Sequence, residues 1–152
     1  MAGFIVMEDG RAYAASNRGT DAVLRAIATE VEDAEFRAWL LQQQSQFVGM
    51  GMTSVDLREV APKYRQGFYR AARRAHERAA SEGFEGLTGD WEGFPGWLER
   101  FGDLVVMIDR SLAGEPPEAF NPHMRALIPP TGWRRGPGWS GSDTSQGPDA
   151  AE

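Results

Sequence analysis

The first hydrophobic and polar positions of the chain predict a β-hairpin. Two short strand-like runs, residues 4–7 and 11–14, flank the pair Asp9 and Gly10. Aspartate and glycine tolerate the positive φ angles of a tight turn, so this pair is expected to connect two antiparallel strands. Because a two-stranded ribbon is only marginally stable in water, the hairpin must pack against another part of the chain.

Downstream of the hairpin, apolar residues recur at helical spacing. Thr20 or Asp21 is suited to cap a first helix, because its side-chain oxygen can accept a hydrogen bond from a backbone N–H. The apolar positions of this helix are Val23, Leu24, Ile27 and Val31. A second helix is expected to open at Glu32 and Asp33 and to end around residues 49–51, where glycines disfavour continuation. Its buried stripe is predicted to be Phe36, Trp39, Leu40 and Phe47, with Gln43 beside them.

Residues 54–60 fit either a helical turn or a strand, and both interpretations stay open. A third helix is predicted to begin at Pro62, whose missing N–H costs nothing in the first turn, and to end at the C-cap Gly83. Small and aromatic residues form its packing face: Tyr64, Phe68, Ala71, Ala72, Ala75 and Ala79. The opposite face carries Arg70, Arg73, Arg74 and Arg78.

The last predicted helix follows a glycine-rich aromatic segment. Residues 83–96 hold too many large apolar groups to stay solvated, so an ordered loop is expected there. Pro95 begins the helix and Gly114 ends it. One face carries a long apolar stripe made of Trp97, Leu98, Phe101, Leu104, Val105, Ile108 and Leu112. The weight of this stripe predicts that the last helix is the most buried element.

Together these elements predict a single α+β domain that is predominantly helical, with an N-terminal β-hairpin packed on about four helices. A chain of 152 residues is long enough for one such domain. We assign it to residues 1–128. Glycine, proline, serine and aspartate dominate from Pro129 onward, so residues 129–152 are predicted to form a flexible tail.

Composition narrows the function classes. The chain has no cysteine, which excludes disulfides, thiolate metal sites and a cysteine nucleophile, and fits a cytoplasmic protein. No stretch approaches the ~20 apolar residues of a membrane span, and the N-terminus lacks the features of a signal peptide. The net charge of −6 disfavours general affinity for nucleic acid or for an anionic membrane.

The charges are arranged in two opposed blocks. Residues 61–80 contain six basic residues and one acidic residue, and residues 81–121 contain nine carboxylates and two arginines. The basic helix at residues 62–81 therefore offers a nucleic-acid-binding alternative through Arg70, Arg73, Arg74 and Arg78. However, Arg73 and Glu77 are spaced for an intrahelical pair, and the acidic block can neutralise the rest. We favour an internal or solvated charge arrangement.

Catalytic motifs are missing from the sequence. His76 and His123 lack the spacing that places two metal ligands on one helix face, and no metal or cofactor is implied. No Gly-x-Ser-x-Gly elbow or phosphate-binding loop occurs. Glu99 and Asp103, four residues apart, share one helix face and could in principle do acid/base work, but a solvated acidic face is simpler. We expect a protein that is not an enzyme.

The acidic aromatic segment and the helix after it are the predicted partner-binding site. An aromatic anchor beside carboxylates is a useful combination at interfaces, because the ring supplies buried area and the acids steer a basic partner. The candidate residues are Asp90, Trp91, Glu92, Phe94, Glu99 and Asp103. The alternative is that Trp91 and Phe94 fill the core beneath the loop.

The N-terminal residues Gly3 to Tyr13, followed by the run Asp21 to Arg25, resemble the start of small cytoplasmic bacterial proteins of the immunity-protein kind. Such proteins bind secreted toxins and protect the producing cell. The resemblance implies a cytosolic binder that occludes a toxin's active site, with acidic groups facing a basic enzyme. The basic helix departs from a uniformly acidic design and leaves the binding face open.

Three functions are therefore carried forward. The first is a non-enzymatic protein-binding module, an immunity- or antitoxin-like inhibitor whose partner is a basic toxin domain. The second is a nucleic-acid-binding accessory protein that uses the basic helix. The third is a carboxylate-dependent enzyme, ranked last. No membrane partner is expected, and the oligomeric state is open.

Overall fold

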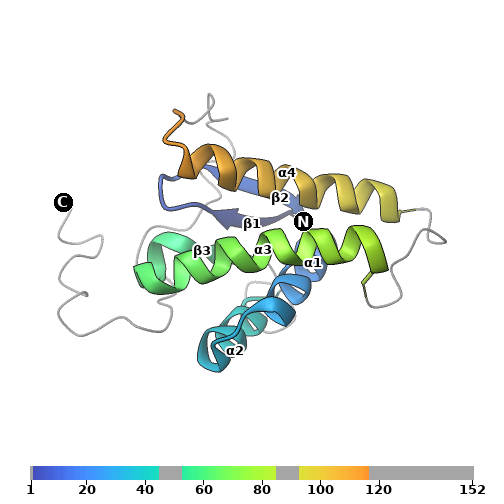
Figure 1. Ribbon diagram of the computed structural model, residues 1–152, viewed down its shortest axis with the longest axis horizontal. Helices are drawn as coiled ribbons and strands as arrows, with labels where there is room; N and C mark the ends of the chain where they lie inside the picture. The colour runs from blue at the N-terminus through green and yellow to red at the C-terminus, as the bar shows by residue number, and fades with distance from the viewer. Residues whose placement is uncertain (1, 45–52, 85–92, 117–152) are drawn as a thin grey trace.

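The computed structural model describes residues 2–44, 53–84 and 93–116 and confirms the predicted class, a mostly helical α+β fold (Figure 1). Three strands and four α-helices are present in this part of the chain. In chain order the elements are β1 (Ala2–Val6), β2 (Ala12–Ser16), α1 (Asn17–Glu30), α2 (Ala34–Gln42), β3 (Ser54–Asp56), the 3-10 helix η2 (Leu57–Glu59), α3 (Pro62–Glu82) and α4 (Phe94–Leu112).

The predicted hairpin forms two strands of a three-stranded mixed sheet. β1 is the central strand, antiparallel to β2 through the pair Ile5 and Tyr13 and parallel to β3 through Ile5 and Val55. Gly10 has a φ of 91°, a conformation that glycine adopts without strain, which explains the tight turn. The third strand therefore supports the ribbon that two strands alone could not stabilise.

The ambiguous segment 54–60 contains both of the structures that its sequence allowed. β3 ends at Asp56, and the 3-10 turn η2 begins at the next residue. The carboxylate of Asp56 accepts a hydrogen bond from the backbone N–H of Arg58 at 3.0 Å and also binds the Arg58 guanidinium at 2.7 Å. Asp56 is thus both the last residue of the strand and the cap of the turn, because its side chain satisfies a free amide.

Helix α1 begins earlier than predicted. Its N-cap is Ser16, whose hydroxyl accepts a hydrogen bond from the Gly19 N–H at 3.0 Å. The predicted caps, Thr20 and Asp21, lie inside the helix, where the Thr20 hydroxyl donates to the Ser16 carbonyl at 2.9 Å. A Cβ on Gly3 would lie 2.7 Å from the Thr20 side chain, so glycine is required where β1 passes α1.

The prediction that the last helix is the most buried element is wrong. Seven of the fourteen residues of α1 are buried, against five of the nineteen in α4. α1 contacts the sheet, α2 and α3, whereas α4 contacts α3 and β2 from one side (Figure 1). Leu112, predicted to be in the core, is 48% exposed near the end of α4. The burial of a helix in this fold therefore depends on whether it has neighbours on several sides. It does not depend on the length of the helix's apolar stripe.

Of the remaining helices, α3 follows its predicted pattern closely and α2 is shorter than predicted. α3 spans Pro62–Glu82 and ends at Gly83, whose φ is 77°, and its whole predicted packing face is buried. α2 starts after its N-cap Asp33 but ends at Gln42, sooner than expected. The side-chain amides of Gln43 and Gln44 bind the carbonyls of its last turn at 2.9 and 3.0 Å.

Three predictions concern parts of the chain that lie outside the described residues. They are the packing of Phe47, the ordered loop up to residue 92, and the flexible tail at 129–152. The domain boundary at residue 128 also falls there and stays a prediction.

Candidate functional site

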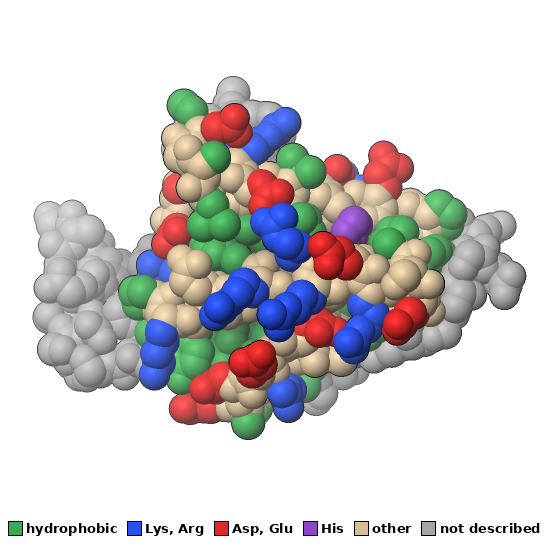
Figure 2. Space-filling model, in the orientation of Figure 1, with side chains coloured by type: hydrophobic (Ala, Val, Ile, Leu, Met, Phe, Trp, Pro, Cys, Tyr) green, Lys and Arg blue, Asp and Glu red, His purple; other side chains and the backbone are tan. Residues whose placement is uncertain are grey.

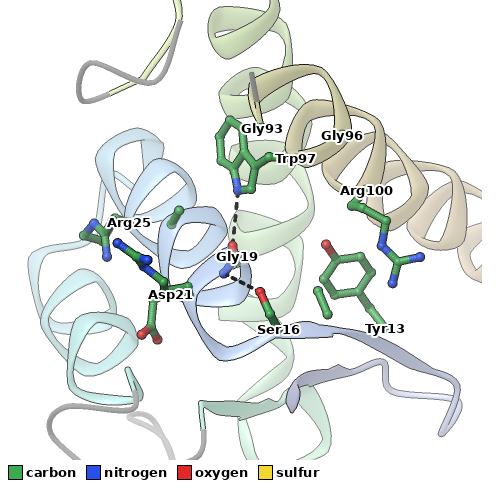
Figure 3. Close-up of a pocket in the computed structure, with 12 residues that line it drawn as sticks. Tyr13, Ser16, Gly19, Asp21, Arg25, Gly93, Gly96, Trp97 and Arg100 are labelled. Carbon is green, nitrogen blue, oxygen red and sulfur yellow. Dashed lines mark hydrogen bonds between the residues drawn. The ribbon is translucent and has the colours of Figure 1, made fainter. Parts of the chain in front are cut away.

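A cleft of about 720 Å³ lies between the N-terminal ends of α1 and α4, with β2 beside it (Figure 3). Strand β2 contributes Tyr13 and α4 contributes Trp97 and Arg100. Most of the charged groups come from α1. The cleft therefore joins segments more than eighty residues apart in the sequence.

The floor of the cleft is a fixed contact between α1 and α4. The indole N–H of Trp97 donates a hydrogen bond to the Gly19 carbonyl at 3.2 Å. The Trp97 ring packs against Phe84, Phe94 and Phe101, with ring centroids 5.6 to 6.2 Å apart. Trp97 itself is only 7% exposed, so its ring joins the cleft to the hydrophobic core.

Three guanidinium groups and one carboxylate line the cleft: Arg18, Arg25, Arg100 and Asp21. Arg25 donates to the side-chain oxygen of Gln44 at 3.0 Å, and Asp21 accepts a hydrogen bond from the Thr53 hydroxyl. Arg100 donates to the backbone carbonyl of Ala14. These contacts hold Arg25, Asp21 and Arg100 in the wall of the cleft. Among the described lining residues, positive charges still outnumber negative ones.

Tyr13 supplies a neutral hydroxyl at the edge of the cleft. Burial raises the pKa of Tyr13 to about 12; Arg100 partly opposes this rise and Asp103 adds to it. The phenol therefore stays protonated near neutral pH. It can form hydrogen bonds there but does not provide a phenolate base.

The structure separates the residues of the predicted partner-binding site. Phe94 is 8% exposed and packs against Trp97, so it belongs to the core, as the alternative interpretation held. Glu99 and Asp103 are exposed on α4, four residues apart on one face. Asp90, Trp91 and Glu92 lie outside the described residues.

The arginines of α3 are interleaved with carboxylates from other elements. Arg73 pairs with Asp109 of α4, and not with Glu77 as its spacing suggested. Figure 2 shows the alternation of basic and acidic side chains on this face. The other two ion pairs join Arg78 to Glu30 at 2.8 Å and Arg74 to Glu32 at 3.8 Å.

Arg70 is exposed, and none of the ion pairs found in the described ranges includes it. The other three basic side chains of the row face opposite charges. This arrangement agrees with the interpretation that we favoured from the sequence, a solvated network of opposite charges. A continuous basic stripe would lack these pairs.

His76 packs at the contact between α3 and α4. Its ring meets the Phe101 ring edge-on, with centroids 5.4 Å apart, and a Cβ on Gly102 would lie 3.2 Å from its Nε2 atom. Within the described ranges, no group of three or more histidine, aspartate or glutamate side chains is arranged to hold a metal ion.

Sequence reasoning missed the arginine-lined cleft. Arg18 and Arg25 belong to the first helix and Arg100 to the last, and no sequence spacing links them. One local signal was present: the first turn of α1 contains Arg18 and no acidic residue, although the helix dipole favours an anion there.

Comparisons of the chain with protein-family models, with curated proteins and with solved structures find no match. Across residues 2–44, 53–84 and 93–116, no helix has both the length and the apolar character needed to cross a bilayer.

Proposed function

We propose that the protein is a non-enzymatic protein-binding module, an immunity- or antitoxin-like inhibitor that binds a basic toxin domain in the bacterial cytoplasm. The observation that carries the proposal is the outward face of α4. We call this face the α4 surface and define it as Glu99, Asp103, Val106 and Arg110, which recur at helical spacing and are all exposed.

The α4 surface combines an apolar centre with charged surroundings. Val106 is 48% exposed, and the other exposed large hydrophobic residue of the described chain, Leu112, belongs to the same helix. A small apolar patch with a polar rim is the usual pattern of a protein interface. The two carboxylates that precede Val106 on this face would accelerate association with a basic partner by electrostatic steering.

The α4 surface has two carboxylates and one cation, Arg110, which lies 4.0 Å from Glu115, and this balance supports a basic partner. No cation among the described residues lies within ion-pair distance of Glu99, and Asp103 has only Arg100 at 4.0 Å. By contrast, most arginines of α3 already face carboxylates. The described structure therefore favours acidic recognition by α4 over nucleic-acid binding by α3.

The test starts by recovering the partner. The immobilised full chain is used to capture proteins from the source organism, and the captured species is identified, purified and assayed for toxin activity. The proposal expects inhibition of that activity at equimolar protein. The double variant E99K/D103K should lower the association rate about tenfold or more at low salt, with a weaker salt dependence than the parent protein.

The matched control is E77K, which makes one such charge reversal at an exposed site on α3. It should leave association close to that of the parent protein. If E99K/D103K associates and inhibits as well as E77K does, the α4 surface is not the interface. A captured partner without toxin activity, or one that is not inhibited, would reject the immunity-type function itself.

A further inference from the structure

We propose that the cleft between α1 and α4 binds a small anion that carries at least two carboxylate or phosphate groups. This inference goes beyond protein binding, because it concerns a concave site beside the α4 surface. The cleft volume, about 720 Å³, falls in the range of roughly 300–1,000 Å³ that is usual for small-molecule sites.

The charge of the lining selects the class of ligand. Three arginines face the cleft against a single aspartate. Guanidinium groups match carboxylate and phosphate oxygens in paired hydrogen bonds, which makes arginine the usual residue for such ligands. The whole chain carries a net charge of −6, so this local excess of positive charge runs against the overall balance.

Arg18 is the most informative of the three arginines. It is exposed in the first turn of α1, and no hydrogen bond or ion pair joins its side chain to the described residues. A cation at this position is disfavoured by the positive end of the helix dipole. A bound anion would remove that unfavourable interaction and use the free donors of the guanidinium.

The positions of the cations explain why the ligand needs two anionic groups. Figure 3 shows Arg25 and Asp21 on one side of the Trp97–Gly19 hydrogen bond, and Arg100 with Tyr13 on the other. A ligand that lies across this floor would place one anionic group at each side. Trp97 and Tyr13 line the cleft along this path, but both side chains are largely buried.

The cleft is preorganised for binding. Ser16 fixes the start of α1, Trp97 ties α4 to Gly19, and Thr53 holds Asp21. Arg100 is held by the Ala14 carbonyl. Because the walls of the cleft are already ordered, binding a ligand loses little conformational entropy, and this improves the affinity.

The test is isothermal titration calorimetry of the full chain with citrate and with pyrophosphate, with ionic strength held constant. At least one of the two should bind with a Kd of about 1 mM or tighter, and the stronger one identifies a carboxylate or a phosphate preference. Acetate and inorganic phosphate, each with one anionic group, should bind at least about tenfold more weakly.

Variants locate the site. R18Q and R100Q should each weaken binding about tenfold, because each removes a charged hydrogen-bond donor. The matched control R70Q removes an exposed arginine of α3 and should stay within about twofold of the parent protein. E99K should also retain binding, so a failure of the α4 surface as an interface leaves this test intact.

Three results would overturn the inference. The first is absence of binding of both citrate and pyrophosphate at roughly 10 mM. The second is an equal loss of affinity in R18Q and R70Q, which would show general attraction of anions. The third is equal affinity for the stronger of the two ligands and for its counterpart with one anionic group, which is acetate for citrate and inorganic phosphate for pyrophosphate. Circular dichroism checks that each variant is folded. If R100Q loses helix because its contact with the Ala14 carbonyl is broken, the affinity of R18Q alone tests the location of the site.

Discussion

The outer faces of α3 and α4 lie side by side and both carry charged side chains, yet they differ in how those charges are balanced (Figures 1 and 2). On α3, Arg73, Arg74 and Arg78 each face a carboxylate from another element. On α4, Glu99 has no cationic partner among the described residues, and Val106 is exposed between charged neighbours.

This difference shows that a charge block in a sequence is not a charge patch on a surface. The basic block of α3 is balanced by Glu30 and Glu32, which precede it in the chain by some forty residues, and by Asp109. Tertiary contacts therefore neutralise most of the basic block of α3. Part of the acidic block, on α4, remains exposed to solvent. Four predictions test this contrast.

The largest expected effect concerns the residue that holds the two helices together. Phe101 is fully buried on α4 and contacts His76 of α3 and Trp97. F101A should lower the free energy of unfolding by about 3–5 kcal/mol, because it removes a large buried ring and leaves a cavity. Urea unfolding measures the change. V106A on the exposed face is the control and should change stability by less than about 0.5 kcal/mol. Equal losses in the two variants would reject the assigned core.

The second effect concerns binding by the exposed face. V106K places a positive charge at the apolar centre of the α4 surface, where it would repel the basic partner, and should weaken the complex by about 1–2 kcal/mol. Stability should hardly change, since the side chain is already 48% exposed. Q66K adds the same charge at an exposed site of α3 and should bind as the parent protein does. Surface plasmon resonance compares the two variants, and similar affinities would remove Val106 from the interface.

Much of the fold was predictable because local rules and tertiary packing agree. The hairpin turn at Gly10 and the helix from Pro62 to Gly83 depend on backbone preferences that single residues carry. The alanine face of α3 also follows directly from helical periodicity. For these elements, short-range chemistry is enough.

Other features depend on contacts between distant segments and could not be read from local patterns. β3 is a three-residue strand whose pairing with β1 defines it. α1 became the most buried helix because it has neighbours on several sides. In the candidate sites, helical spacing correctly placed Glu99 and Asp103 on one exposed face. It could not show that Phe94 turns into the core or that Arg18 and Arg100 share a cleft.

The third effect is a loss of stability at alkaline pH. Burial raises the pKa of Tyr13, beside α4, and of Tyr69, on α3, to about 12. In the unfolded chain these phenols ionise near pH 10, so between pH ~10 and ~12 the folded state binds more protons than the unfolded state. Stability should therefore fall as pH rises through this window.

Single substitutions separate the two tyrosines. Y13F and Y69F should each reduce the decrease in the free energy of unfolding at alkaline pH, because phenylalanine has no group to ionise. Urea unfolding at several pH values measures this decrease. The chain has three tyrosines, so the difference in phenolate absorbance between the native parent protein and each native variant reports the pKa of the tyrosine that was removed. Native titration of both tyrosines near pH 10 would show that neither hydroxyl is shielded in the fold.

The smallest effect is expected from the ion pair that joins the two faces. Arg73 and Asp109 are each about half exposed, at 50% and 46% of their side-chain area, so solvent screens their attraction and the pair should stabilise the fold by about 0.5 kcal/mol or less. A double-mutant cycle of R73Q, D109N and the combined variant measures the coupling. A coupling above about 2 kcal/mol would mean that this pair locks α3 to α4, and the two faces would then form one charge network and not two independent surfaces.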